Sequence, residues 1–285
     1  MKMKNKAIEK NKTTDLIFIS LRRFCSVFSI LTLFLLNGCL TEDVILKKAY
    51  QKFDLGYYQS AINDFNELIK SNSDNEEAYL YRGLSYYYLN NIENAKVDLN
   101  KAQIKSLNPK IYCTASNYLG WISLENEKDT ISALSYFTNA KDFYENRVSK
   151  DIFSVSQIYY ALGKINYYFM KSAPYKSDDY YKYRDEAMNN FNQSIHVNKY
   201  YEFGFWGKGL IHYSDGYYDS AYADANMAII LYHKFSRAYY LRALCEKKLN
   251  GNQQAICNDY KKAIKYQEEE GEKIIDSVGL GEGCR

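Results

Sequence analysis

The stretch Ala78–Ala102, AYLYRGLSYYYLNNIENAKVDLNKA, decides the fold. Each half places small and large apolar residues at helical spacing on one face, and the polar corner Asn90-Asn91 separates the halves. A small side chain lets a neighbouring helix approach closely, and a large apolar one fills the space beside it. The small residues are Gly83, Ala95 and Ala102, and the large ones are Tyr79, Tyr86 and Leu99. The stretch therefore predicts two short helices that pack on each other as a hairpin.

The same arrangement recurs along the chain with a period of 34 residues, and such a period is typical of repeat proteins. In four hairpins the small residue of the second helix follows that of the first by twelve positions. These pairs are Ala49 and Ala61, Gly83 and Ala95, Gly209 and Ala221, and Ala243 and Ala255. Two looser hairpins pair Gly120 with Ala133, with one extra corner residue, and Gly163 with Ala187, with about twelve extra residues.

These residues resemble the signature of the tetratricopeptide repeat (TPR) over roughly residues 42–265. Tyr79, Gly83, Tyr86, Ala95, Leu99 and Ala102 follow the signature best, and the Gly-Tyr-Tyr corners at 56–58 and 216–218 match its interhelix turn. The proline that usually closes each TPR unit is mostly replaced by Asn and Ser. The resemblance implies an all-α fold, an α-solenoid of about six helical hairpins that forms a right-handed superhelix.

The spacing of the hairpins sets the expected boundaries. We expect a signal peptide over residues 1–38, a linker over 39–43, a repeat domain over 44–268, and a helical cap and tail over 270–285. The expected repeat units are about 42–75, 76–109, 113–147, 156–201, 202–235 and 236–269, with the insert at 171–184 in the fourth.

The N-terminal region has the pattern of an export signal. Basic residues end at Arg22-Arg23, and an apolar run over residues 24–36 follows, too short to span a bilayer comfortably. The run ends in Leu36-Asn37-Gly38-Cys39, which resembles the lipobox of bacterial lipoproteins. This resemblance implies that Cys39 is acylated, that Leu40 directs the chain to the outer membrane, and that the protein is lipid-anchored in the bacterial cell envelope. The alternative is an uncleaved anchor with a chance cysteine.

The charge of the chain gives no reason to expect nucleic acid as a partner. Of 37 basic and 34 acidic side chains, seven basic and two acidic ones lie in the first 38 residues. The remaining 30 basic and 32 acidic side chains leave a net charge of −2. A nearly neutral body gives no electrostatic reason to expect binding to a phosphate backbone.

The sequence shows no arrangement of residues that could catalyse a reaction. The three histidines, His196, His212 and His233, have no second ligand at zinc-site spacing, and neither a GxSxG nor a Walker motif occurs. The glycine-rich run 279–283 has no strand before it and no helix after it, unlike a phosphate-binding loop. We therefore expect no enzyme activity, no metal site and no cofactor.

Six cysteines leave a choice of disulfides. Cys25 is lost with the signal peptide and Cys39 is acylated, so Cys113, Cys245, Cys257 and Cys284 remain, with three possible pairings. We favour a bond between Cys257 and Cys284, which would join the terminal segment to the last repeat. The alternative is that these cysteines are free, buried thiols.

The TPR resemblance also implies where a partner binds, because the first helix of each TPR unit faces the groove. The groove positions rich in aromatic and arginine side chains, the types that most often dominate binding energy, are Tyr87, Trp121, Tyr160, Tyr167, Trp206, Tyr213, Arg237 and Tyr240. The same positions also hold residues such as Leu84, Asn117, Lys164 and Leu210. The alternative is that these aromatics only pack between neighbouring helices.

Three functions compete on this basis. The first is a membrane-anchored scaffold that binds a segment of another envelope protein or a peptide in its groove. The second is a glycan-binding helical lipoprotein of a nutrient-uptake system. The third is a hydrolase, which no residue spacing supports, and the fold alone does not choose among these functions.

Overall fold

The computed structural model describes residues 42–146, 152–270 and 284, and these residues form helices and short connections without a β-strand. The described chain divides into two compact units, one up to Asn91 and the other from Ile92 onward. The all-α prediction is confirmed, and helical hairpins occur in both units. The two helices predicted over residues 78–102 are present, but they belong to different units. The predictions for the signal peptide, for Cys39 and for the cap around residues 271–278 concern residues outside those that the structure describes.

The described part of the first unit holds three helices: residues 42–54, α2 (Tyr58–Ser71) and α3 (Glu76–Tyr88). The corner before α2 turns at Gly56, whose φ of 77° favours glycine. Asn75 caps α3 by accepting a hydrogen bond from the backbone N–H of Ala78. The core between the helices consists of Ala49, Ala61, Phe65, Leu68 and Ala78.

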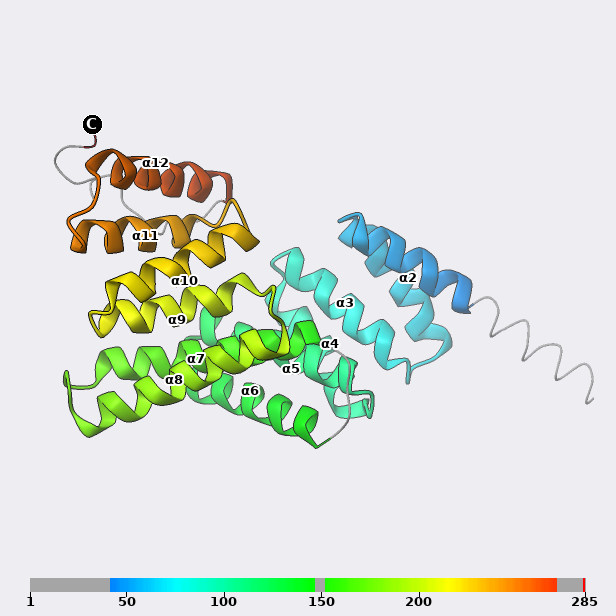
Figure 1. Ribbon diagram of the computed structural model, residues 1–285. Helices are drawn as coiled ribbons and strands as arrows, with labels where there is room; N and C mark the ends of the chain where they lie inside the picture. The colour runs from blue at the N-terminus through cyan, green and yellow to red at the C-terminus, as the bar shows by residue number, and fades with distance from the viewer. Residues whose placement is uncertain (1–41, 147–151, 271–283, 285) are drawn as a thin grey trace, which may run out of the picture. The chain divides into compact units, whose positions relative to one another are not determined.

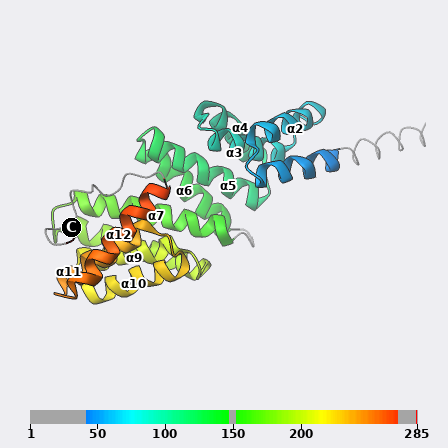
Figure 2. The same ribbon diagram turned by 90° about the horizontal axis from the view of Figure 1, so that it is seen from above.

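The second unit begins with α4 (Ile92–Lys105) and continues with a series of antiparallel hairpins (Figures 1 and 2). They are α5 (Pro109–Trp121) with α6 (Thr130–Glu145), α7 (Ile152–Ser172) with α8 (Asp178–Val197), α9 (Glu202–Ser214) with α10 (Tyr218–Leu231), and α11 (Ser236–Lys248) with α12 (Gln253–Glu270). A π-helical turn, η1 (Ile122–Asn126), extends α5. Each helix packs against its neighbours in the series.

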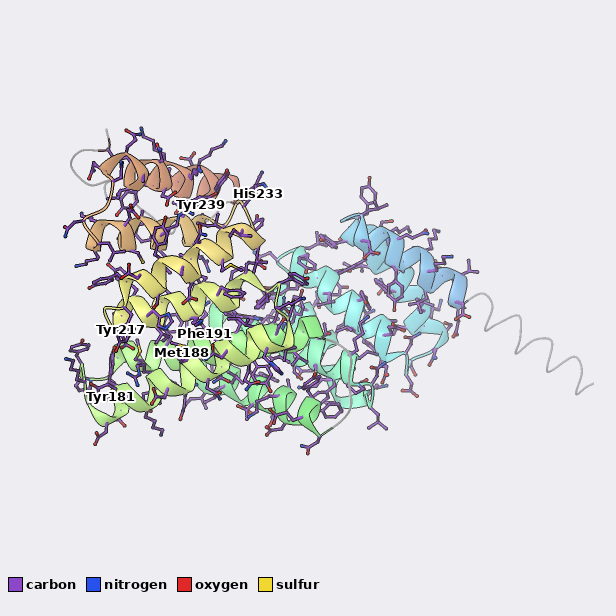
Figure 3. All side chains as sticks on the ribbon, viewed as in Figure 1. Tyr181, Met188, Phe191, Tyr217, His233 and Tyr239 are labelled. Carbon is purple, nitrogen blue, oxygen red and sulfur yellow. A yellow bond between two sulfur atoms is a disulfide. The ribbon has the colours of Figure 1, made fainter. Side chains whose placement is uncertain are left out.

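Glycines allow the close helix packing that the sequence predicts. Phe191 of α8 is buried between α7 and α9, and Figure 3 shows it together with Met188 in the layer between α8 and α9. A Cβ on Gly207 would lie 2.4 Å from the Phe191 ring, and one on Gly163 would lie 2.6 Å from it. Gly120 admits Phe137 in the same way. Each phenyl ring therefore fills a space that only glycine leaves open.

The extra residues of the fourth hairpin lengthen its helices. Helices α7 and α8 contain 21 and 20 residues, whereas α9 and α10 contain 13 and 14. Only residues 173–177 connect them, so the insert forms no long loop.

One small-residue assignment is wrong. Ala255 is exposed, and Ile256 takes the buried position instead. The corner between α11 and α12 is four residues long, whereas the corner between α9 and α10 has three. This extra residue moves the buried face of α12 by one position. No helix in the part of the chain that the structure describes is long and apolar enough to cross a membrane.

Candidate binding face

The first helices of the four hairpins in the second unit, α5, α7, α9 and α11, form one layer. Helix α5 packs against α7, α7 against α9, and α9 against α11, in addition to the contacts within each hairpin. We call these four helices the first-helix layer. The layer places side chains from four successive repeats next to one another.

Trp121, at the end of α5, is half-buried at the start of this layer. Its ring meets Phe137 edge-on, with ring centroids 5.5 Å apart, so the indole has a fixed orientation. The ammonium group of Lys164, on α7, lies 4.8 Å from the centroid of the same ring. This arrangement is a cation–π contact between adjacent first helices.

Trp206, on α9, repeats this arrangement with the next first helix. It is half-buried, and the ring of Phe235 lies 5.9 Å away. The guanidinium of Arg237, on α11, lies 5.5 Å from the indole centroid. Both predicted tryptophans of the layer are therefore half-buried and covered in part by a basic side chain of the following first helix.

Tyr168 lies between these two sites and is 49% exposed. Burial raises the pKa of its hydroxyl, the positive charge of Arg237 lowers it, and the negative charge of Glu125 raises it. Charges from η1 and α11 thus both act on this hydroxyl of α7.

An open cavity of about 580 Å³ adjoins Tyr168. Its walls come from α7 and from the corner between α5 and α6, and they are formed by Leu124, Glu125, Lys128, Thr130, Lys164 and Tyr168. The Lys164 Nζ lies 3.2 Å from the Glu125 Oε1. The cavity therefore combines an apolar wall, an aromatic ring, two hydroxyl groups, two ammonium groups and one carboxylate.

Tyr160 does not belong to an accessible face, contrary to the prediction. It is 4% exposed and lies in the core with Phe191. Tyr201 and Phe203 cover it, with ring centroids 5.9 and 5.3 Å away. Its hairpin position is that of a groove residue, but the start of the next hairpin fills the space in front of it.

The remaining predicted tyrosines of the layer are half-buried. Burial raises the pKa of the Tyr167 hydroxyl, and a hydrogen bond with Ser214 acts in the opposite direction. Burial also raises the pKa of Tyr213. The Tyr240 ring packs 5.8 Å from that of Tyr260 on α12. These three tyrosines pack against neighbouring helices and are also partly exposed. Their positions therefore agree in part with a binding role and in part with a packing role.

Tyr87 belongs to the first unit. It is half-buried at the end of α3, and its ring meets that of Tyr88 edge-on at 5.7 Å.

The cysteines fall into two classes. Cys257 and Cys284 form a disulfide with a Cα–Cα distance of 5.1 Å, and both are buried beside Tyr260. Cys113 and Cys245 are buried thiols outside this disulfide. Burial, assisted by the negative charge of Asp224, raises the pKa of the Cys245 thiol to about 12, so this thiol stays protonated and unreactive.

His212 has a packing role with one polar contact. Its Nδ1 lies 2.7 Å from the Oδ2 of Asp224, and Lys208 lies 3.3 Å from the other carboxylate oxygen. Nowhere in the described part of the chain do three or more His, Cys, Asp or Glu side chains converge as metal ligands do.

A repeated polar contact escaped the sequence analysis. Asp224 and Asp259 occupy the same position on α10 and α12, three residues after the buried Ala221 and Ile256. Arg242 donates two hydrogen bonds to Asp259, at 2.7 and 2.8 Å, and a third to Asn226 of the preceding hairpin at 2.6 Å. In the first unit, Arg82 bonds Asn66 in the same way. Aligning charged residues as well as small ones would have revealed this pattern.

Comparison with known proteins supports the fold. The structure is similar to the C-terminal part of a TPR repeat-containing protein from Cytophaga hutchinsonii, with TM-score 0.50, 20% identity, and coverage of 79% of this chain and 80% of that one. It is also similar to PilW, a type IV pilus biogenesis factor, with TM-score 0.59, 16% identity, and coverage of 82% and 96%. It is also similar to PilF of Pseudomonas aeruginosa, with TM-score 0.61, 14% identity, and coverage of 83% of this chain and 100% of that one.

No protein-family model and no curated protein matches the sequence. At these identities the similarity to solved structures shows the TPR fold.

Proposed function

We propose that this protein is a lipid-anchored TPR scaffold of the bacterial cell envelope that binds a segment of a partner protein along its first-helix layer. The observation that carries the proposal is the pair of half-buried tryptophans, Trp121 and Trp206, each beside a basic side chain of the next first helix. Tryptophan and arginine are the side chains that most often dominate protein interfaces. Rigid anchors of this kind lose little conformational entropy when a partner binds.

The spacing of the anchors suits an extended segment. They lie on α5 and α9, and α7 lies between them with Tyr168 exposed. A partner that reaches both tryptophans would cross three successive first helices. A scaffold of this kind orients its partner and requires no catalytic group. The solved relatives PilW and PilF include a type IV pilus biogenesis factor, so an assembly role in the envelope is consistent with the fold.

The binding proposal is tested by a photoreactive amino acid at position 168, introduced in the native host. We expect ultraviolet light to cross-link one envelope protein, and mass spectrometry to identify the linked segment. A synthetic peptide of that segment should then bind Trp121→Ala/Trp206→Ala at least tenfold more weakly than the wild type.

The matched control is Tyr136→Ala/Tyr222→Ala, which removes two half-buried aromatics from the second helices α6 and α10. Its affinity for the peptide should stay within twofold of the wild type, and circular dichroism checks that both variants are folded. Equal affinities for the wild type and the tryptophan variant would refute the binding face.

The anchor is tested separately at Cys39. Growth with an alkyne-labelled fatty acid should label the wild type and leave Cys39→Ser unlabelled, and only the labelled protein should fractionate with the outer membrane. Labelling of Cys39→Ser at the wild-type level would contradict acylation at this residue.

A further inference from the structure

The cavity beside Tyr168 is lined by two lysines, one at a position that is otherwise apolar in this chain and one at a corner position that is mostly glycine or asparagine. In a repeat protein the other hairpins show which residue type a position needs for packing alone. A residue that differs from its equivalents in the other hairpins, where packing does not require the difference, indicates a role in binding at that position.

Lys164 occupies a position where the other hairpins have large apolar side chains. The equivalent residues, each following the small residue of its first helix, are Tyr50, Leu84, Trp121, Leu210 and Leu244. The Lys164 side chain is only 16% exposed. Its Nζ lies between two aromatic faces, 4.8 Å from Trp121 and 6.0 Å from Tyr168. A largely buried ammonium is costly to place, so an apolar residue would serve packing better.

Lys128 occupies the left-handed corner of its hairpin, with a φ of 58°. The corner residues with positive φ in the other hairpins are Gly56, Asn90, Lys176, Gly216 and Asn250, and four of these five are glycine or asparagine, the types that tolerate this conformation. Lysine at this corner is strained relative to glycine or asparagine. Residues held in such conformations cluster at functional sites.

The charges around the cavity favour a negative ligand. Of the residues that line the cavity, Lys128 and Lys164 are basic and Glu125 is acidic, and the positive charge of Arg237 also acts on the Tyr168 hydroxyl. The chain from Cys39 onward carries a net charge of −2, so this excess of positive charge is local. The contact between Lys164 and Glu125 shows that a carboxylate fits there. Leu124 and Tyr168 offer apolar contact to an aliphatic stem.

We propose that this cavity binds an acidic side chain of the partner segment, with its carboxylate at Lys164 and Lys128 and its stem against Leu124 and Tyr168. The inference rests on the proposed function, since it gives the bound segment a chemical character. Glu125, whose side chain is 52% exposed, then acts as an internal competitor for Lys164. Binding exchanges one carboxylate for another at the same ammonium group.

A random 12-residue peptide library displayed on phage provides the probe. Selection on the wild-type protein should enrich peptides that contain Asp or Glu. The most frequent peptide is then synthesised together with the isostere in which Gln or Asn replaces each acidic residue. We expect the isostere to bind at least tenfold more weakly in fluorescence anisotropy, because charge-assisted hydrogen bonds are lost.

Three variants separate recognition from folding. Lys164→Leu introduces leucine, which stands at the equivalent position in three other hairpins. This variant should bind the acidic peptide and its isostere equally. Lys128→Asn carries a residue of two other corners, and it should unfold at higher urea concentration yet bind the acidic peptide several-fold more weakly. Glu125→Gln should bind the acidic peptide several-fold more tightly. The control Lys261→Leu, exposed on α12, should match the wild type.

The outcomes distinguish this inference from the proposed function. Peptides that depend on Trp121 and Trp206 but show no acidic preference would overturn the inference and leave the scaffold function intact. The absence of any selected peptide would count against both. An acidic preference that persists in Lys164→Leu, or tighter binding of basic peptides, would overturn the inference. Binding of an acidic oligosaccharide through Lys164 in place of the peptide would also overturn the inference.

Discussion

The hairpins α9/α10 and α11/α12 have the same plan but are held together differently. Each has a buried aspartate at the same position of its second helix, Asp224 and Asp259. Lys208 and His212 share the carboxylate of Asp224, whereas Arg242 alone binds both oxygens of Asp259 and also reaches Asn226 on α10. Only α11/α12 carries a disulfide among the described residues.

Their places in the repeat series explain this difference. Helices α9 and α10 pack against hairpins on both sides, whereas the described contacts of α11 and α12 with another hairpin are with α9 and α10 alone. A hairpin whose described neighbours lie on one side has less apolar packing from them, and directed interactions add to its stability. The planar guanidinium of Arg242 can bind a carboxylate and an amide at once, which a lysine ammonium does less well. The last hairpin is thus joined to its neighbour by directed bonds.

The largest effect is expected from removal of the disulfide. Cys257→Ser frees a cross-link that closes 27 residues, and chain entropy alone predicts a loss of about 3.5 kcal/mol in the free energy of unfolding. Urea denaturation followed by circular dichroism measures the loss. Cys284→Ser, and the wild type under reducing conditions, should give the same midpoint. An unchanged midpoint in all three would show that the covalent bond does not support the last hairpin.

Removal of the arginine should rank second. Arg242→Met leaves the buried Asp259 carboxylate without its main partner, and we expect a loss of about 2–3 kcal/mol in the free energy of unfolding. The double variant Arg242→Met/Asp259→Asn removes the unpaired charge and should recover part of this loss in the same urea experiment. A double variant with the sum of the two single losses would show that the two residues act independently.

The equivalent change in the inner hairpin should cost less. In Lys208→Met the Asp224 carboxylate keeps His212, and the lysine side chain is 29% exposed, so we expect a loss of about 1 kcal/mol. Parallel urea titrations of Lys208→Met and Arg242→Met test the comparison directly. Equal losses would contradict the distinction drawn between the two hairpins.

A local test of the comparison uses Cys245, which packs against α10 between the two hairpins. Since burial raises its pKa to about 12 from an ordinary 9.0, its thiolate at pH 8 is about 1,000-fold rarer than that of an exposed thiol. Alkylation by iodoacetamide, followed by mass spectrometry, should be at least that much slower than in urea. In Cys257→Ser the rate should rise if the last hairpin detaches, and fast alkylation of the native wild type would contradict the packing.

Local spacing predicted most of the fold. The small residues at Ala61, Gly120 and Gly163 are buried against their helical neighbours, because close helix contacts depend on side-chain size and a fixed period. The prediction that Ala255 is buried was wrong, because a fixed 34-residue period does not account for the extra residue in the corner before α12. Corner length depends on backbone conformations such as the positive φ of Asn250, which the residue types alone do not fix.

The binding face was predicted less completely. Trp121 and Trp206 lie in one layer with basic neighbours, but Tyr160 is buried because Tyr201 and Phe203 of the following hairpin cover it. Whether an aromatic side chain stays accessible depends on how the next hairpin begins. Lys128 went unnoticed because its significance lies in a backbone angle, whereas Lys164 could have been singled out by position-by-position comparison of the repeats.

Contacts restricted to adjacent hairpins have a consequence for how this protein tolerates change. In the described second unit, α5 and α11 do not pack against each other. A substitution in one of these helices therefore does not directly alter the packing of the other. Damage, gain or loss of a hairpin is then a local event. Recognition near Trp121 can diverge while the far end keeps its own bonds, which gives such a chain room to acquire new partners one segment at a time.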